Sequence, residues 1–124
     1  MKKILVVDDE QSIRELIKDK LLKDNFSVIA AASGEEGVAL ARLKKPDLIL
    51  LDIAMSGIDG YSACKEIKSD SQTQNIPVVF LTGKDLDLQS VAQRCNELSA
   101  SGYISKASSL KELSDKIREV LFES

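Results

Sequence analysis

The feature that most constrains the fold of this chain is a series of short apolar runs separated by segments of helical periodicity. The apolar runs begin near Ile4, Phe26, Leu48, Val78 and Tyr103. Each run has the length of a strand, and each is followed by a longer segment that has a helix-like pattern. Strand–helix alternation repeated five times predicts an α/β fold, in which a parallel sheet carries helices on both faces.

The helical segments are recognised by apolar residues spaced three and four apart and by capping signals. The clearest apolar stripes are Ile13, Leu16, Ile17 and Leu21; Leu88, Val91, Ala92 and Cys95; and Leu110, Leu113, Ile117, Val120 and Leu121. Weaker helices are predicted over residues 35–43 and 60–68. Ser33 with Glu36, and Ser109 with Glu112, have the spacing of a capping box, which marks a helix start. The polar stretch 69–75 is predicted to be a loop.

The composition of the runs indicates their order in the sheet. The first, third and fourth runs are wholly apolar, as expected of strands that are covered on both faces. The second run contains Ser27 and the fifth contains Ser105, so these two are assigned to the edges. With right-handed crossovers, the order 2-1-3-4-5 satisfies this pattern. The prediction is a flavodoxin-like, doubly wound five-stranded parallel sheet.

Length and composition indicate one domain over residues 1–124. The hydrophobic content of 44% and the charged content of 30% are those of a soluble globular chain. A net charge of −3 without clustered Lys or Arg argues against a nucleic-acid surface. No apolar stretch approaches the roughly 20 residues of a membrane span, and the apolar run after Lys3 is too short for a signal peptide. We therefore expect a cytoplasmic protein with no membrane contact.

The cysteine and histidine counts exclude several chemistries. Cys64 and Cys95 lack the spacing of a zinc or redox motif and are expected to be reduced thiols in the core. The chain has no histidine. A Ser-His-Asp triad and a phosphohistidine on this chain are therefore excluded.

Four of the apolar runs end in polar residues that suit a metal-assisted phosphate site. Asp8 and Asp9 follow the first run, Asp52 ends the third, Thr82 ends the fourth and Lys106 follows the fifth. In an open parallel sheet, ligands bind outside the carboxyl ends of the strands. Three carboxylates gathered there repel one another and must take up protons or bind a cation. Ligands that are all oxygen favour a hard ion such as Mg²⁺.

This arrangement suggests a role for each residue. An aspartate can act as a nucleophile and form an aspartyl phosphate. Asp52, alone at the end of a central strand, is the best candidate. Asp9 is expected to bind the metal directly and Asp8 through water. Lys106 is expected to balance the charge of the transferred phosphoryl group, and Thr82 to donate a hydrogen bond to it.

Each of these residues also has a purely structural interpretation. Asp8 and Asp9 precede a helix and could cap it, at about 1 kcal/mol. Asp52 could cap a loop, Thr82 could merely end a strand, and Lys106 could be solvated. All of them fall at strand ends on one rim of the predicted sheet, and this coincidence favours the functional interpretation.

Several motifs of the chain resemble those of the receiver domain of response regulators in two-component signalling. The resemblance covers essentially all 124 residues and is highly specific in combination. The matching segments are Lys3 to Glu10 with its acid pair, Pro46 to Asp52, Met55 with Asp59-Gly60, Pro77 to Gly83, and Gly102 to Lys106.

The resemblance implies a phosphorylation switch and not an enzyme. A histidine kinase or phosphotransfer protein would donate a phosphoryl group to Asp52 with Mg²⁺, and the backbone carbonyl of Ala54 would be a further metal ligand. Thr82 and Tyr103 would be the switch residues, although Tyr103 could also be only a half-buried aromatic of an edge strand. A downstream protein would bind the face made by the fourth helix, fifth strand and fifth helix. Since the last helix ends the chain, a stand-alone, chemotaxis-type receiver is expected.

The chain departs from the family pattern at several positions. Ala107 replaces the proline that usually follows the lysine, and a cis bond before a non-proline residue costs about 2.5–4 kcal/mol. We therefore expect a trans Lys106–Ala107 bond, a shifted loop and a displaced lysine head. Ser56 also replaces a common proline, which loosens its loop. The segment 96–101 lacks the usual Gly-Ala turn, and this puts the fourth helix and its partner surface in doubt. Ala54 and Lys84 are expected to tune hydrolysis.

Two other function classes compete with the phosphoacceptor switch. A pseudo-receiver would be an interaction module that works without phosphate. The missing proline and the altered region of the fourth helix motivate it. An enzyme of similar architecture is disfavoured. A flavin mononucleotide protein needs a phosphate-binding loop after the first strand, where Asp8-Asp9-Glu10 would repel phosphate. An aspartate-based phosphatase needs a DxD pattern there, which this chain lacks.

Overall fold

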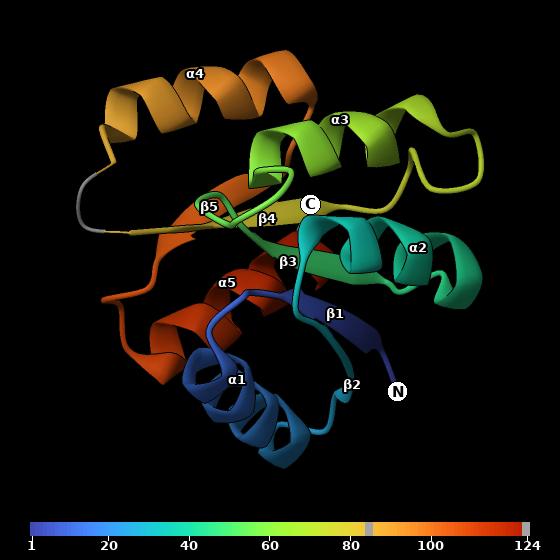
Figure 1. Ribbon diagram of the computed structural model, residues 1–124. Helices are drawn as coiled ribbons and strands as arrows, with labels where there is room; N and C mark the ends of the chain where they lie inside the picture. The colour runs from blue at the N-terminus through green and yellow to red at the C-terminus, as the bar shows by residue number, and fades with distance from the viewer. Residues whose placement is uncertain (84–85, 123–124) are drawn as a thin grey trace.

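The computed structural model describes residues 1–83 and 86–122 and shows five strands that alternate with five helices (Figure 1). The strands are β1 (Lys3–Val7), β2 (Ser27–Ala31), β3 (Leu48–Asp52), β4 (Val78–Thr82) and β5 (Gly102–Ser105). The helices are α1 (Gln11–Lys23), α2 (Gly34–Lys44), α3 (Gly60–Ser69), α4 (Leu88–Leu98) and α5 (Leu110–Phe122). The predicted alternation is confirmed.

The strands form one parallel sheet in the order β2-β1-β3-β4-β5, as the composition of the apolar runs predicts. The register sets the carboxyl ends side by side: Val7 pairs with Leu51, Asp52 with Leu81 and Thr82 with Ser105. The strand order reverses between β1 and β3, and this is the point where open α/β sheets bind ligands.

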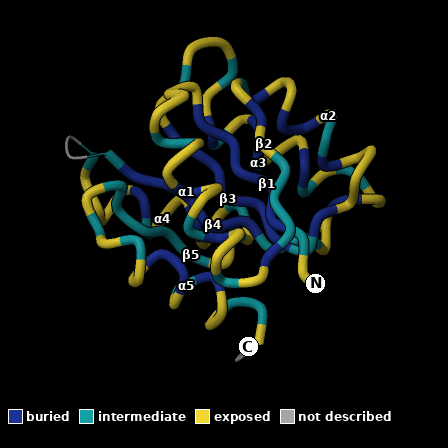
Figure 2. Tube along the Cα trace, turned by 90° about the horizontal axis from the view of Figure 1, so that it is seen from below, coloured by how far each residue is buried: buried dark blue, intermediate teal, exposed yellow. Residues whose placement is uncertain are grey.

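The helices cover both faces of the sheet, α2, α3 and α4 on one side and α1 and α5 on the other (Figure 1). Side chains alternate between the faces along each strand. In β1, Leu5 and Val7 pack toward α2 and α3, whereas Ile4 and Val6 pack toward α1 and α5. All three central strands are buried, so the tube drawn by burial is dark through the middle of the molecule (Figure 2).

Most helix signals are confirmed, with two corrections. Ser33 caps α2 by accepting from the Glu36 N–H, and Ser109 accepts from the N–H of Glu112 at the start of α5. Cys64 and Cys95 are free thiols buried on α3 and α4, as expected. Two members of the predicted apolar stripes, however, are about half exposed, because they lie at the margins of their helix faces: Leu16 at 52% and Leu88 at 53%.

The loop 69–75 and the end of α4 are more ordered than the sequence indicates. Thr73 is buried, and its hydroxyl donates to the Ile67 carbonyl at 2.7 Å, which closes the loop on the end of α3. The helix α4 ends with Ser99 in the left-handed region (φ 58°), and the Ala100 N–H donates to the Cys95 carbonyl at 2.9 Å. This is the Schellman pattern that usually uses glycine. The missing Gly-Ala turn therefore does not prevent a regular end to α4.

One close approach fixes the loop after β3 against the start of α3. Gly60 donates its N–H to the Ile53 carbonyl at 2.8 Å. A Cβ at Gly60 would lie 2.7 Å from Ile53 Cα and would also overlap the backbone of Asp52. Only glycine fits here without moving the end of the strand that carries Asp52.

We expect Gly60→Ala to lower the free energy of unfolding by about 1–3 kcal/mol, because the neighbouring backbone has to shift to admit the methyl group. Urea denaturation measures this change. Gly83→Ala is the matched control, since a Cβ at Gly83 meets no atom of the described residues within 4 Å. Equal stabilities of the two variants would contradict the close packing at Gly60.

Candidate functional site

The polar residues predicted at the strand ends lie at one edge of the sheet. Asp52 ends β3 and Thr82 ends β4, while Asp8 directly follows β1. Asp8 and Thr82 are 0% exposed and Asp52 is 1% exposed, whereas Asp9 is exposed. Two carboxylates are therefore taken out of water at the end of a hydrophobic sheet, where burial without a partner is costly.

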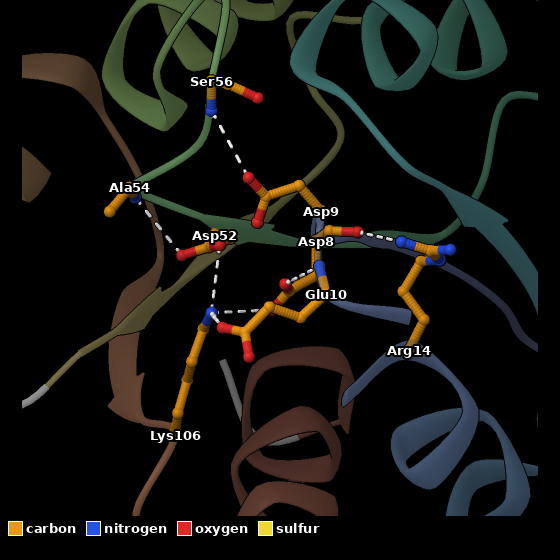
Figure 3. Close-up of polar contacts among 8 residues, drawn as sticks. All are labelled: Asp8, Asp9, Glu10, Arg14, Asp52, Ala54, Ser56 and Lys106. Atoms are coloured by element: carbon orange, nitrogen blue, oxygen red, sulfur yellow. Dashed lines mark hydrogen bonds and ion pairs between the residues drawn. The ribbon is translucent and has the colours of Figure 1, made fainter. Parts of the chain in front are cut away.

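Lys106 supplies the partner for both buried carboxylates (Figure 3). Its Nζ lies 2.9 Å from Asp8 Oδ2 and 3.0 Å from Asp52 Oδ2, and a third carboxylate oxygen, Glu10 Oε1, is 3.2 Å away. Burial lowers the pKa of Lys106, but the hydrogen bonds and charges of Asp8 and Asp52 outweigh burial and raise its pKa above the ordinary value. Lys106 is therefore a permanent cation in this site.

Asp52 is held at both oxygens. Oδ1 accepts from the Ala54 backbone N–H at 3.2 Å, and Oδ2 accepts from Lys106. Burial raises the pKa of Asp52 from 3.8 to about 6, the Lys106 hydrogen bond opposes this, and the nearby Asp8 adds to it. At neutral pH Asp52 is thus an ionised carboxylate in an environment that disfavours its charge, and an added cation relieves that cost.

The loop after β1 is fixed by contacts that hold both of its aspartates. Asp8 Oδ1 accepts from the Glu10 N–H at 2.9 Å, and Asp9 Oδ2 accepts from the Ser56 N–H at 3.4 Å. Arg14, from the first turn of α1, donates to the Asp8 carbonyl at 2.7 Å (Figure 3). Helix α1 begins after Glu10 without a side-chain cap. The interpretation of Asp8 and Asp9 as helix caps is therefore wrong.

Arg14 and Glu10 are the site residues that sequence reasoning missed. In the sequence Glu10 is only the third member of the acidic triplet Asp8-Asp9-Glu10, and nothing in its spacing indicates a contact with Lys106. Arg14 carries a weak signal, because the first turn of a helix that follows a strand end lies beside that end. A cationic side chain at that position can reach the loop after β1 and donate a hydrogen bond to a backbone carbonyl there.

The acidic group fits a hard divalent cation. Asp8, Asp9 and Asp52 each offer one carboxylate oxygen, and these oxygens lie within 4.8 Å of one another. Oxygen ligands with no nitrogen or sulfur match the preference of Mg²⁺. The hydroxyl of Thr82 is buried and has no hydrogen-bond partner among residues 1–83 and 86–122. A free buried donor or acceptor beside the cluster is consistent with a site that takes a further polar group.

The departures from the family pattern have little effect on the site. The Lys106–Ala107 bond is trans, as predicted. The expected displacement of the lysine head is wrong: the flexible four-carbon stem carries the ammonium to Asp8 and Asp52. Tyr103 is partly buried in β5 and packs against the core, so its switch role stays a prediction. The carbonyl role of Ala54 also stays a prediction, and Lys84 lies outside the described residues.

The fold and the site together define a class of protein. The sheet has the order 2-1-3-4-5, its switch point is lined by carboxylates, and a hydroxyl and a lysine end the neighbouring strands. This combination is that of receiver proteins, which share the flavodoxin-like arrangement but have acids where a flavin protein needs a phosphate-binding loop.

The comparisons with known proteins identify the family. A family model for the response regulator receiver domain matches residues 4–118, and the chain belongs to this family. The chain is 42% identical over 122 residues to the probable transcriptional regulator ycf27 of Cyanophora paradoxa, a match that covers 97% of this chain and 48% of that protein. It is 38% identical over 120 residues to the alkaline phosphatase synthesis transcriptional regulatory protein PhoP of Bacillus subtilis, with coverages of 97% and 48%.

The solved structures agree with this placement. The chemotaxis protein CheY4 of Vibrio cholerae superposes with a TM-score of 0.90 at 28% sequence identity, over 98% of this chain and 99% of that one. The chain spans about half the length of the two regulators above, so the expectation of a stand-alone receiver stays a prediction. Within the described ranges, no helix combines the length and the apolar character needed to cross a membrane.

Proposed function

We propose that this domain is a phosphorylation switch that accepts a phosphoryl group on Asp52 from a histidine kinase or a phosphotransfer protein, with Mg²⁺ as cofactor. The observation that carries the proposal is the setting of Asp52. Its carboxylate is buried beside other acids and accepts hydrogen bonds from Lys106 and from the Ala54 N–H. Burial raises its pKa to about 6. Membership of the response regulator receiver family supports the same role in two-component signalling. We propose that the protein is located in the cytoplasm.

The residues of the chain divide the chemistry among them. A carboxylate oxygen of Asp52 forms a bond to phosphorus, while the phosphorus–nitrogen bond of the donor's phosphohistidine breaks and its electron pair returns to the imidazole. Asp8, Asp9, Asp52 and the Ala54 carbonyl would hold Mg²⁺, which when bound offsets the negative charge of the acids and of the phosphate oxygens. Lys106 would stabilise the charge of the transferred group. Thr82, whose buried hydroxyl has no hydrogen-bond partner within the described ranges, would donate to that group.

The output of the switch is proposed to be a change on the face of α4, β5 and α5. Phosphorylation replaces the single negative charge of Asp52 with a phosphoryl group that carries nearly two negative charges. Thr82 and Tyr103 would transmit the effect of this change toward that face for a downstream protein. Shifting a population from 1% to 99% active takes about 5.5 kcal/mol, whereas coupling energies are typically about 1–3 kcal/mol. Incomplete switching is expected. The domain itself turns over no substrate in this scheme, apart from forming and losing its own phosphoryl group.

The proposal is tested by incubating the protein with acetyl phosphate and Mg²⁺ and measuring its intact mass. We expect the wild type to gain one phosphoryl group and Asp52→Asn to gain none. A pseudo-receiver would show no gain in either protein, and phosphorylation of Asp52→Asn would place the acceptor elsewhere. The position of Lys106, close to Asp8 and Asp52, supports the phosphoacceptor over the pseudo-receiver.

A further inference from the structure

Glu10 shares Lys106 with the two buried aspartates, although it is not one of the acids at a strand end. Its Oε1 is 3.2 Å from Lys106 Nζ, compared with 2.9 Å for Asp8 Oδ2 and 3.0 Å for Asp52 Oδ2 (Figure 3). An ammonium group has three donors. Lys106 donates hydrogen bonds to Glu10 Oε1 and Asp52 Oδ2, while Asp8 Oδ2 lies at ion-pair distance without a hydrogen bond. An oxygen of an incoming phosphoryl group therefore competes with these carboxylates for Lys106.

Of the three carboxylates, Glu10 can lose its contact with Lys106 at the lowest cost in free energy. Its side chain is 59% exposed, whereas those of Asp8 and Asp52 are 0% and 2% exposed. Water can replace Lys106 around an exposed carboxylate, but a buried carboxylate that loses its partner keeps an uncompensated charge. Glu10 therefore accepts a hydrogen bond from Lys106 that a phosphoryl oxygen would otherwise accept. It also adds a negative charge to the solvent-exposed side of the site.

We propose that Glu10 selects phosphodonors by their charge: its carboxylate competes for Lys106 and repels a donor more strongly the more negative the donor is. This inference rests on the proposed phosphorylation of Asp52. The favoured class of donor is one whose phosphoryl group is bonded to a nitrogen that carries a positive charge. The disfavoured class is the acyl phosphates, whose leaving group offers no such compensation.

Two small donors of different charge separate these classes. Acetyl phosphate is a dianion near neutral pH: Asp52 bonds to its phosphorus, the phosphorus–oxygen bond breaks, and the electron pair leaves with acetate. Phosphoramidate carries one negative charge fewer, because its nitrogen is protonated. In that case the phosphorus–nitrogen bond breaks, and the electron pair leaves with ammonia. Both reactions give the same aspartyl phosphate, so the ratio of their rates reports on the approach of the donor.

The test measures the rate of mass gain with each donor for the wild type, Glu10→Gln and Glu15→Gln. We expect Glu10→Gln to accelerate labelling by acetyl phosphate about three- to tenfold, the effect of one charge a few ångströms away in a largely aqueous setting. Labelling by phosphoramidate should rise by a smaller factor. Glu15→Gln removes the same charge from an exposed position on α1, where Glu15 bonds to Gln11, and should leave the ratio unchanged.

A second measurement separates charge from structure. Raising the ionic strength screens an exposed charge, so the difference between the wild type and Glu10→Gln should narrow as salt is added. Labelling of all three proteins with an unchanged rate ratio, or a difference that is indifferent to salt, would overturn the role of Glu10 and leave the proposed function intact. Absence of label on the wild type with both donors would overturn the proposed function and this inference with it.

Discussion

Asp9→Asn is expected to weaken Mg²⁺ binding by about tenfold or more, because Asp9 is the exposed carboxylate of the three-acid group and the one that a hydrated ion reaches first. Mg²⁺ is held by few carboxylates, so each contributes heavily. Even groups that only orient a ligand typically contribute 10–100-fold, or about 1.4–2.8 kcal/mol, to metal affinity. Asparagine keeps the shape of the side chain and an oxygen that can accept from Ser56. The loss therefore reports on the charge. Titration calorimetry with MgCl₂ measures the change.

Asp59→Asn is the matched control for this experiment. Asp59 carries the same charge on the nearby loop, but its side chain caps α3 by accepting from the Ser62 N–H. Asparagine caps a helix as well as aspartate does, so this variant should fold and bind Mg²⁺ as the wild type does. An equal loss of Mg²⁺ affinity in the two variants would show that binding depends only on the overall charge near the site. That result would contradict the ligand role of Asp9.

Asp52→Asn is expected to make the metal-free protein more stable at neutral pH while removing the proposed phosphoacceptor. Burial raises the pKa of Asp52 in the folded state to about 6, above the ordinary 3.8. Between these two values the folded protein binds more protons than the unfolded chain, so the stability of the wild type falls as the pH rises through this window. Asparagine carries no charge, so the stability of Asp52→Asn does not fall for this reason as the pH rises.

The expected gain is about 1–3 kcal/mol at pH 7.5, since one pKa unit corresponds to about 1.4 kcal/mol and the Lys106 contact is partly solvated. Near pH 4 the gain should vanish, because Asp52 is then largely protonated in the folded protein. Urea unfolding in a chelator at both values of pH measures the difference. A variant that is less stable than the wild type at pH 7.5 would mean that the Lys106 contact outweighs the burial of Asp52.

The fold was predictable from the sequence because its determinants are local in the chain. Strand order followed from which runs are wholly apolar, and Ser27 and Ser105 do lie on the two edge strands. The helix limits agree with the capping signals at Ser33 and Ser109. The edges of the buried helix faces were less predictable. Periodicity places Leu16 on the apolar face of its helix, but it does not show that the rest of the protein leaves Leu16 exposed to solvent.

The members of the site were predictable as strand ends, but their contacts were not. Asp8, Asp52 and Thr82 are buried at one edge as the topology requires. The reach of Lys106 depends on side-chain torsions that no motif encodes, and its expected displacement was wrong for that reason. Its contact with Glu10 joins residues far apart in the chain. The repulsion among the acids is thus offset in part by Lys106, whereas the sequence interpretation considered only protonation or a bound cation for this role and assigned Lys106 to the transferred phosphoryl group.

The proposed Mg²⁺-dependent phosphorylation of Asp52 is tested by the rate of phosphoryl incorporation into the wild-type protein as a function of Mg²⁺ concentration, with acetyl phosphate held constant. We expect a rate that rises and saturates, with a midpoint that agrees with the Mg²⁺ dissociation constant from calorimetry. A rate that is the same in excess chelator as in saturating Mg²⁺ would contradict it.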